Sequence, residues 1–261
     1  MIKKEICWNI TARCNQACKY CHRFLNINDL TTEEQTIISE NLKNSGVTSI
    51  TWTGGEALLV KNIEKLLEKS YGYGIKNKII TNGKLLTHDK IDRIYKYVDS
   101  ITLSIDSVDS DINDNLGRGR KHYDEIKDIL DYISYKNYNV KIRINSVICK
   151  NNADTFYEMV EFLNNYKIYS WRIFKFMPLR ELAKKNKDLF DIGMDKYESI
   201  IKYIKSNSKI EQIDTRIEKD MEKKYILILA NGDIVITENG EDKVVGNALN
   251  DSVKKYLDGV D

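Results

Sequence analysis

The sequence predicts an α/β protein, a partial (β/α)6 barrel of the TIM type with a C-terminal, hairpin-containing cap. Two observations indicate this fold. Six stretches typical of strands are each followed by a stretch with helical character or a turn, and the connections are short. Repeated strand–helix units form a parallel sheet with helices outside it. A flat, doubly wound sheet is the alternative, but no dinucleotide-type glycine fingerprint follows the first strand.

The expected elements alternate along the chain up to its single proline, Pro178. β-Branched or alternating residues predict the strands, while capping residues and apolar stripes predict the helices. We therefore expect residues 1–178 to form the barrel. The strands are expected at residues 5–11, 47–53, 76–81, 100–106, 139–148 and 169–177, and the helices at residues 32–44, 61–73, 86–97, 122–136 and 153–164.

A different pattern follows in residues 179–261, which we expect to be an extension that packs on the same domain and covers the open side of the barrel. The dipeptide Asn231-Gly232 lies between two apolar stretches and is a strong signal for a two-residue turn. It predicts a hairpin over residues 225–237. The remaining expected elements are a helix at 195–206, a strand or extended connector at 211–218, and a short helix at 251–257.

Several expected strands are polar on one face, although strands of a buried parallel sheet are usually apolar on both. Because buried polar groups without partners are unfavourable, we expect these residues to line a pocket that holds ligand or water. Hydrogen bonds among the residues themselves are the alternative. The polar faces carry Cys7, Asn9 and Thr11 on the first strand, Thr102, Ser104 and Asp106 on the fourth, and Lys141, Arg143 and Asn145 on the fifth.

The composition limits the class of protein. A chain of 261 residues, 42% hydrophobic and 31% charged, is long enough for one large domain with a substantial core. A net charge of only +2 argues against a dedicated nucleic-acid binder or a polybasic membrane anchor. No apolar stretch reaches the length of a signal sequence or a membrane span. We expect a cytoplasmic protein without membrane targeting or stable nucleic-acid binding.

Three cysteines, Cys14, Cys18 and Cys21, follow the first expected strand. Iron–sulfur clusters prefer thiolate ligands, and three thiolates would leave one iron of a four-iron cluster open to another ligand. A zinc site that adds His22 is an alternative, although zinc sites usually show two separated ligand pairs. The cysteines could also belong to an ordinary loop with free thiols, to a disulfide set, or to a c-type haem attachment at residues 18–22, which would need an export signal.

The loop from Cys14 to Cys21, with three and then two residues between its cysteines, resembles the radical S-adenosylmethionine (SAM) superfamily. The resemblance implies a 4Fe-4S cluster on these cysteines, with SAM on its open iron. Reduction by one electron then splits SAM into methionine and a 5′-deoxyadenosyl radical. An electron donor of the flavodoxin or ferredoxin type is implied as well. Cys7 and Cys149 are expected not to be ligands.

The same resemblance implies a SAM pocket at the ends of the following strands. Gly54-Gly55-Glu56 is similar to the motif that holds the methionyl amino group, with Ala57 where the family usually has proline. Glycine also lets a backbone approach a ligand closely, and a glutamate can receive an ammonium group. The further SAM-binding residues that the resemblance implies are Asn82, Ser104, Asp106 and Arg118.

A narrower set of motifs resembles the viperin-like enzymes, radical SAM nucleotide dehydratases of antiviral defence, over roughly residues 7–230. The motifs are Asp106-Ser107, Asn113, Gly117-Arg118-Gly119 and residues 144–148, 171–174 and 224–227. In that family a nucleoside triphosphate loses its ribose 4′ hydrogen and its 3′-hydroxyl, which gives a 3′-deoxy-3′,4′-didehydro nucleotide. The resemblance implies Tyr225 as the catalytic donor of a proton or hydrogen, whereas a tyrosine in the hairpin core is the alternative. Cationic side chains suit a triphosphate, and the expected substrate contacts are Arg143, Asn145, Arg172 and Lys175.

Some positions depart from the viperin-like pattern. Lys175 replaces a glutamine of the sixth-strand motif, and it falls on the opposite strand face from Arg172 unless the strand ends early. Residues 177–179 are more similar to the radical SAM cyclase of molybdopterin synthesis, but the second cysteine triplet of that enzyme is absent. The alternative functions are radical SAM modification of a peptide side chain or a small metabolite, and a non-catalytic zinc-binding module.

Overall fold

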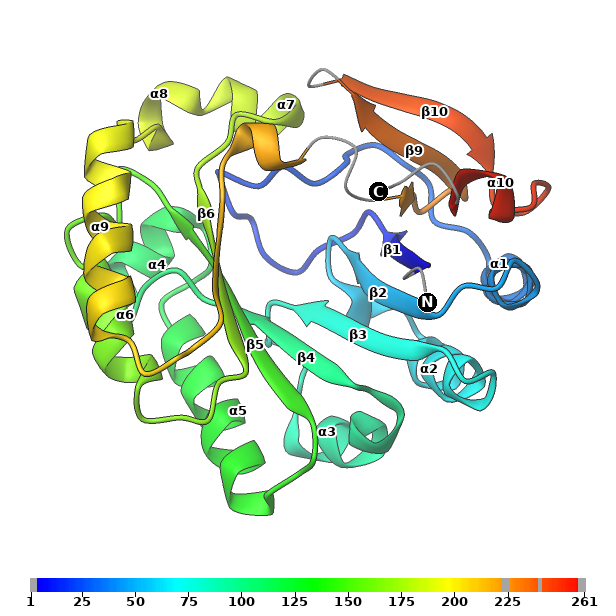
Figure 1. Cartoon of the computed structure of the whole chain (residues 1–261), viewed down its shortest axis with the longest axis horizontal. Helices are drawn as coiled ribbons and strands as arrows, with labels where there is room; N and C mark the ends of the chain where they lie inside the picture. Colours follow the sequence, from blue (N-terminus) through cyan, green and yellow to red (C-terminus); the bar gives the residue numbers. More distant parts are fainter. Residues whose placement is uncertain (1–3, 222–225, 239–240, 258–261) are drawn as a thin grey trace.

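The computed structural model describes residues 4–221, 226–238 and 241–257. Within these residues the strands form one ten-stranded sheet in the order β10-β9-β8-β1-β2-β3-β4-β5-β6-β7 (Figure 1). Strands β1 to β7 are mutually parallel and follow the chain order. Their bounds are Glu5–Thr11 (β1), Ser49–Gly54 (β2), Lys76–Thr81 (β3), Ser100–Ser104 (β4), Lys141–Ile148 (β5), Ser170–Lys175 (β6) and Ile213–Arg216 (β7).

Helices connect the parallel strands on the outer side of the curved sheet (Figure 1). Because β7 and β10 end the strand order, the sheet does not close, and the predicted partial barrel is confirmed. The larger helices are Thr32–Asn44 (α1), Ile63–Gly72 (α2), His88–Ile94 (α3), Ser110–Leu116 (α4), His122–Lys136 (α5), Phe156–Leu163 (α6) and Met194–Asn207 (α9). Shorter elements are Ala57–Leu59 (η1), Tyr95–Tyr97 (η2), Arg180–Lys185 (α7), Lys187–Phe190 (α8), Glu218–Met221 (η3) and Lys254–Leu257 (α10).

The core lies between the sheet and these helices. On β1 the helix-facing residues Ile6, Trp8 and Ile10 are at most 1% exposed, whereas Cys7 and Asn9 on the other face are half-buried. The Trp8 ring lies 5.1 Å from that of Trp52 on the neighbouring strand, measured between ring centres. The two faces of the sheet therefore differ as predicted, with a dry face toward the helices and a polar face toward the barrel interior.

Strand register aligns the polar residues of the inner face. Arg143 pairs with Thr102 on one side and Ser170 on the other, while Asn145 pairs with Ser104 and Arg172. Alternation along each strand sends all of these side chains to the same face. The expected fourth and sixth strands end early, at Ser104 rather than 106 and at Lys175 rather than 177, because the backbone leaves the sheet at the barrel rim.

The C-terminal residues extend the sheet beyond β1. Strand β8 (Ile226–Ile228) pairs in parallel with β1 and antiparallel with β9 (Asp233–Glu238), so the predicted hairpin is confirmed. Its turn is longer than the two residues expected, because the last strand pair is Ile228 with Ile234 and the Gly232 amide donates to the Leu229 carbonyl at 2.9 Å. The strand β10 (Glu241–Asn247) was not predicted, since charged residues fill its first half. The division at residue 178 stays a prediction. None of the helices in the described part of the chain is long and apolar enough to cross a membrane.

Candidate active site

The cysteine loop follows β1 and rests on the end of α4. The Ala17 amide donates a hydrogen bond to the Gly117 carbonyl at 3.1 Å, and the Lys19 amide donates to the Leu116 carbonyl at 3.1 Å. A Cβ atom on Gly117, whose φ is +86°, would lie 2.2 Å from the Ala17 oxygen. Only glycine therefore allows the loop to approach α4 this closely.

Gly54 and Gly55 support the loop from its other end. The Gly55 amide donates to the Thr11 carbonyl at 2.7 Å, and the Glu56 amide donates to the Arg13 carbonyl at 2.9 Å. A Cβ on Gly55 would lie 2.1 Å from the Arg13 oxygen. We expected these glycines to allow a close approach to a ligand. In the structure they allow a close approach to the segment that leads into the cysteines.

The three cysteine thiols lie within electrostatic reach of one another. Burial raises the pKa of Cys18 to about 11, against the attraction of Arg118, and the negative forms of Cys21 and Cys14 raise it further. Burial also raises the pKa of Cys21. A cationic iron–sulfur cluster would relieve both the burial and the mutual repulsion of three thiolates. The donor set therefore fits a cluster held by Cys14, Cys18 and Cys21.

The geometry does not favour a single zinc ion at this loop. In the part of the chain that the structure describes, no three His, Cys, Asp or Glu side chains form a group that could hold one metal ion. Thiolates on separate irons of a cluster stand farther apart than ligands of one ion. The backbone carbonyl of His22 accepts a 2.9 Å hydrogen bond from Arg180. Burial lowers the pKa of His22 to about 4.

Glu56 and Asn82 connect the ends of β2 and β3 to the loop. The Glu56 carboxylate is 1% exposed and accepts from the Leu58 amide at 3.0 Å, the Thr81 hydroxyl at 2.8 Å and the Asn82 amide at 2.8 Å. The Asn82 side chain donates to Asn15 at 2.7 Å and lies 3.7 Å from the Cys14 sulfur. Glu56 thus holds the ends of β2 and β3 together at the barrel rim. A contact between Glu56 and SAM stays a prediction.

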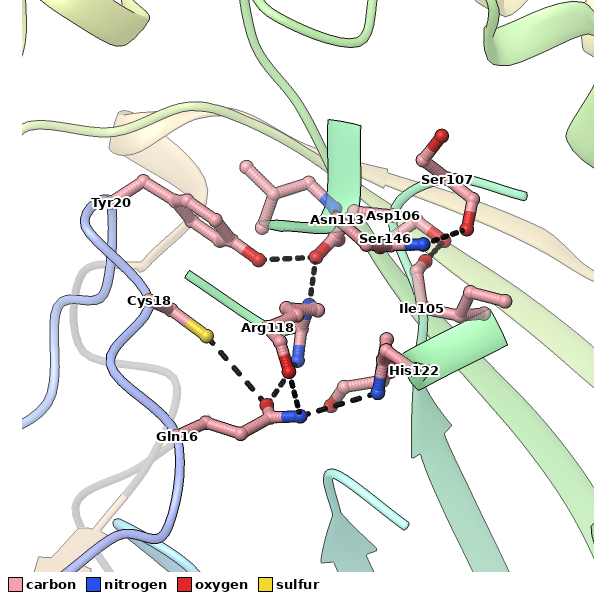
Figure 2. Close-up of polar contacts among 12 residues, drawn as sticks. Gln16, Cys18, Tyr20, Ile105, Asp106, Ser107, Asn113, Arg118, His122 and Ser146 are labelled. Atoms are coloured by element: carbon pink, nitrogen blue, oxygen red, sulfur yellow. Dashed lines mark hydrogen bonds and ion pairs between the residues drawn. The ribbon is translucent and has the colours of Figure 1, made fainter. Parts of the chain in front are cut away.

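A buried polar network joins the loop to the barrel wall (Figure 2). Asp106 and Arg118 form an ion pair in which both side chains are at most 8% exposed, and Tyr20 also donates to Asp106. Burial lowers the pKa of Arg118, but the Asp106 carboxylate and other negative groups outweigh it and hold that pKa above its ordinary value. Gln16 exchanges hydrogen bonds with Arg118 and contacts His122.

The structure brings three of the four expected substrate residues to one face. Arg143 and Arg172 share the inner face of the sheet with Asn145, whereas Lys175 lies on the opposite face, where its ammonium group pairs with Asp191 at 2.8 Å. Arg172 is 2.8 Å from Asp214, measured between side-chain nitrogen and oxygen. Tyr225, the expected catalytic residue, lies outside the described residues.

Two further ion pairs were not predicted. Asp214 on β7 also pairs with Arg216 at 2.9 Å, so one carboxylate holds two guanidinium groups. Arg180, in left-handed backbone conformation at φ +61°, pairs with Asp242 of β10 at 2.8 Å and so ties the hairpin to the cysteine loop. Arg180 and Asp242 are 62 residues apart in sequence, and no local pattern indicates their contact.

A separate surface groove of about 480 Å³ lies between α9 and β7. Met194, Tyr197 and Thr215 are among its lining residues, and none of the cysteines or their partners contributes to it. The groove is therefore not the site of the chemistry, which is organised around the cysteine loop at the barrel rim.

The fold and the site together define a radical SAM enzyme. The sequence profile described as "Radical SAM superfamily" matches residues 8–163, which is more than half of the chain. The chain therefore belongs to the radical SAM superfamily. Enzymes of this superfamily use a 4Fe-4S cluster and SAM, and the three half-buried cysteines fit that requirement.

The similar proteins include curated relatives and solved structures. An S-adenosylmethionine-dependent nucleotide dehydratase of Flammeovirga pacifica is 29% identical over 94% of this chain and 86% of its own length. A protein of the same name from Selenomonas ruminantium is 28% identical over 92% and 89%. Streptococcus suis SuiB bound to the precursor peptide SuiA has a TM-score of 0.76 at 22% identity, covering 98% of this chain and 64% of SuiB. That likeness shows the fold alone.

Proposed function

We propose that this enzyme dehydrates a nucleoside triphosphate to its 3′-deoxy-3′,4′-didehydro form. Relatives named nucleotide dehydratases, which align with more than nine-tenths of the chain, support this assignment. The observation that carries the proposal is the cationic inner wall of the barrel. A wall of arginines is unusual in a barrel interior, and it suits a substrate with several negative charges.

The inner wall has more positive than negative charge. Arg143, Arg172 and Arg216 share this face with Asp214, whose carboxylate pairs with Arg172 and Arg216. Among the described residues the buried Arg143 Nε has no hydrogen-bond partner, while the Arg143 Nη1 donates to the Ser170 hydroxyl at 3.0 Å. Because burial lowers the pKa of Arg143 and the neighbouring Arg172 lowers it further, an anion bound beside Arg143 would make its charged form more favourable. Triphosphate oxygens supply such an anion.

The residues of the chain have separate tasks in this proposal. Cys14, Cys18 and Cys21 hold the cluster, while Gly54, Gly55, Glu56, Asn82, Ser104, Asp106 and Arg118 form or support the SAM side of the rim. Arg143, Asn145 and Arg172 hold the triphosphate deeper in the barrel and present the ribose to that rim. When bound, the cluster and SAM supply a radical that can remove one hydrogen from the substrate.

The cellular setting follows from this chemistry. We propose that a small redox protein of the flavodoxin or ferredoxin type supplies the electron, and that the enzyme acts in the cytoplasm, where nucleoside triphosphates are abundant. A nucleotide without a 3′-hydroxyl cannot be extended by a polymerase, which supports a role in antiviral defence.

The proposal is tested by anaerobic turnover of the reconstituted enzyme. SAM, a reductant and each nucleoside triphosphate are supplied in turn, while 5′-deoxyadenosine and the mass of the nucleotide are followed. We expect one nucleotide to accelerate 5′-deoxyadenosine release and to yield a product lighter by one water. Slow 5′-deoxyadenosine release at a rate that no nucleotide changes would reject the proposal. Peptides and small metabolites would then be tested as substrates.

A further inference from the structure

Cys18 lies between two buried polar side chains that the sequence did not assign to the site. Gln16 is 8% exposed and Tyr20 is 5% exposed, each two residues from the cysteine. Both side chains point away from solvent and converge on the ion pair of Asp106 and Arg118 (Figure 2). The loop is therefore attached to the barrel wall on both sides of its middle thiol.

Stability alone gives a poor account of this ion pair. Removing two charges from water is expensive, and apolar replacements of similar volume are often neutral or stabilising. The pair instead supplies direction, because a guanidinium donates from a rigid planar fork and a carboxylate accepts at defined oxygens. Asp106 is itself fixed, since its Oδ1 accepts from the Val147 amide of β5 at 2.6 Å. The ion pair therefore holds the loop in a fixed position relative to the barrel wall.

His122 fixes the orientation of the Gln16 amide. The His122 Nε2 lies 2.8 Å from the Ser104 carbonyl, which can only accept, so Nε2 carries the hydrogen. Its Nδ1 then accepts from the Gln16 Nε2 at 3.2 Å. The Gln16 Oε1 consequently faces Arg118 Nη1 at 3.1 Å and Cys18 Sγ at 3.7 Å.

The backbone of the cysteine loop is not held by regular secondary structure. Between the end of β1 and the start of α1 the chain has neither helix nor strand. On either side of Cys18, the Ala17 and Lys19 amides of this backbone donate hydrogen bonds to the end of α4. Two bonds along one line restrain translation better than rotation about that line, whereas Gln16 and Tyr20 restrain the rotation.

We infer that Gln16 and Tyr20, held by Asp106 and Arg118, are positioning residues that set the direction in which Cys18 presents its thiolate to the cluster. The inference rests on Cys18 as a cluster ligand and is independent of the nucleotide. Partners of this kind, which orient a ligand without touching the metal, commonly change metal affinity when they are lost.

The test compares two loop variants with two matched controls. Tyr20→Phe and Gln16→Met remove the anchors but leave the ion pair in place. Tyr197→Phe and Gln35→Met alter equally buried residues elsewhere, at 3% and 4% exposure, each of which donates one hydrogen bond to a carbonyl. After anaerobic reconstitution, iron and sulfide per chain, iron release to a chelator, thermal unfolding, and the electron paramagnetic resonance spectrum with and without SAM are measured.

We expect both loop variants to release iron about 10-fold faster than wild type and to show altered spectra with SAM, whereas the controls keep wild-type values. Equal iron release and unchanged spectra in loop and control variants, at comparable thermal stability, would overturn the inference. If a loop variant does not fold, Arg118→Lys keeps the charge but loses the fork, and the same two outcomes apply. If the clusters are intact but no nucleotide accelerates 5′-deoxyadenosine release, the proposed substrate is rejected. The inference about Gln16 and Tyr20 is unaffected by that result.

Discussion

Gly117→Ala should displace the cysteine loop, because the new methyl group would overlap a backbone atom. The Cβ would lie 2.2 Å from the Ala17 oxygen, so the loop must retreat by about 0.8 Å to reach the 3.0 Å that real contacts respect. Left-handed backbone costs an alanine about 1–2 kcal/mol, and forced overlap in a packed site costs about 1–3 kcal/mol. The free energy of unfolding should therefore fall by about 2–5 kcal/mol.

Gly74→Ala provides the matched control. Gly74 has φ +74°, but a Cβ there meets nothing within 4 Å, so only the backbone contribution applies. With about 2–4 °C of Tm per kcal/mol for a domain of this size, Gly117→Ala should unfold at clearly lower temperature than Gly74→Ala. The assay is thermal unfolding together with iron content after anaerobic reconstitution. Equal Tm and equal iron in the two variants would refute the close approach of the loop to α4.

Three further changes have definite expected outcomes. Arg172→Ala should raise the KM for the nucleotide about 10- to 100-fold, the loss of one charge-assisted contact, with unchanged iron content; an unaltered KM in steady-state assays would exclude it from substrate binding. Cys7→Ala should leave iron per chain unchanged by chemical analysis, and a lost cluster would refute the three-ligand assignment. Hydrogen bonds from Tyr138 and Tyr132 lower the pKa of Asp92 in the folded protein. The ionised Asp92 therefore stabilises the fold fully above its unfolded pKa, near 3.8, and this stabilisation is lost as the pH falls through the lower, folded pKa. The Tm gap between wild type and Asp92→Asn should therefore shrink below about pH 4, and a gap constant from pH 6 to 3 would contradict this.

Much of the barrel could be predicted because its signals are local. Alternation on β1 and β5 and the hairpin signal of Asn231-Gly232 depend on neighbours in sequence, and the structure confirms the alternation and the hairpin. The predicted ends of the strands were less accurate. Asp106 was expected to end a strand, whereas the strand ends at Ser104 and the Asp106 carboxylate enters a buried ion pair. A contact between Asp106 and SAM stays a prediction.

The parts of the site that could not be predicted depend on long-range contacts. Gln16 and His122 are separated by 106 residues, and their pairing exists only because α4 and α5 bring one to the other. Likewise, no pattern around Asp214 indicates that it pairs with Arg172 on the neighbouring strand. Composition and spacing identify residues with suitable chemistry, but the fold decides which of them meet.

The open barrel leaves the strands β7 and β10 at the two margins of the sheet, where unpaired backbone groups could recruit another chain. Each margin has a feature that discourages such recruitment. β7 spans only Ile213–Arg216, and β10 begins with the exposed charges of Glu241, Asp242 and Lys243 before an irregular register between Val244 and Gly246. Short, charged or kinked margins are poor templates for aggregation. The molecule can thus keep its interior accessible without becoming prone to edge-to-edge assembly.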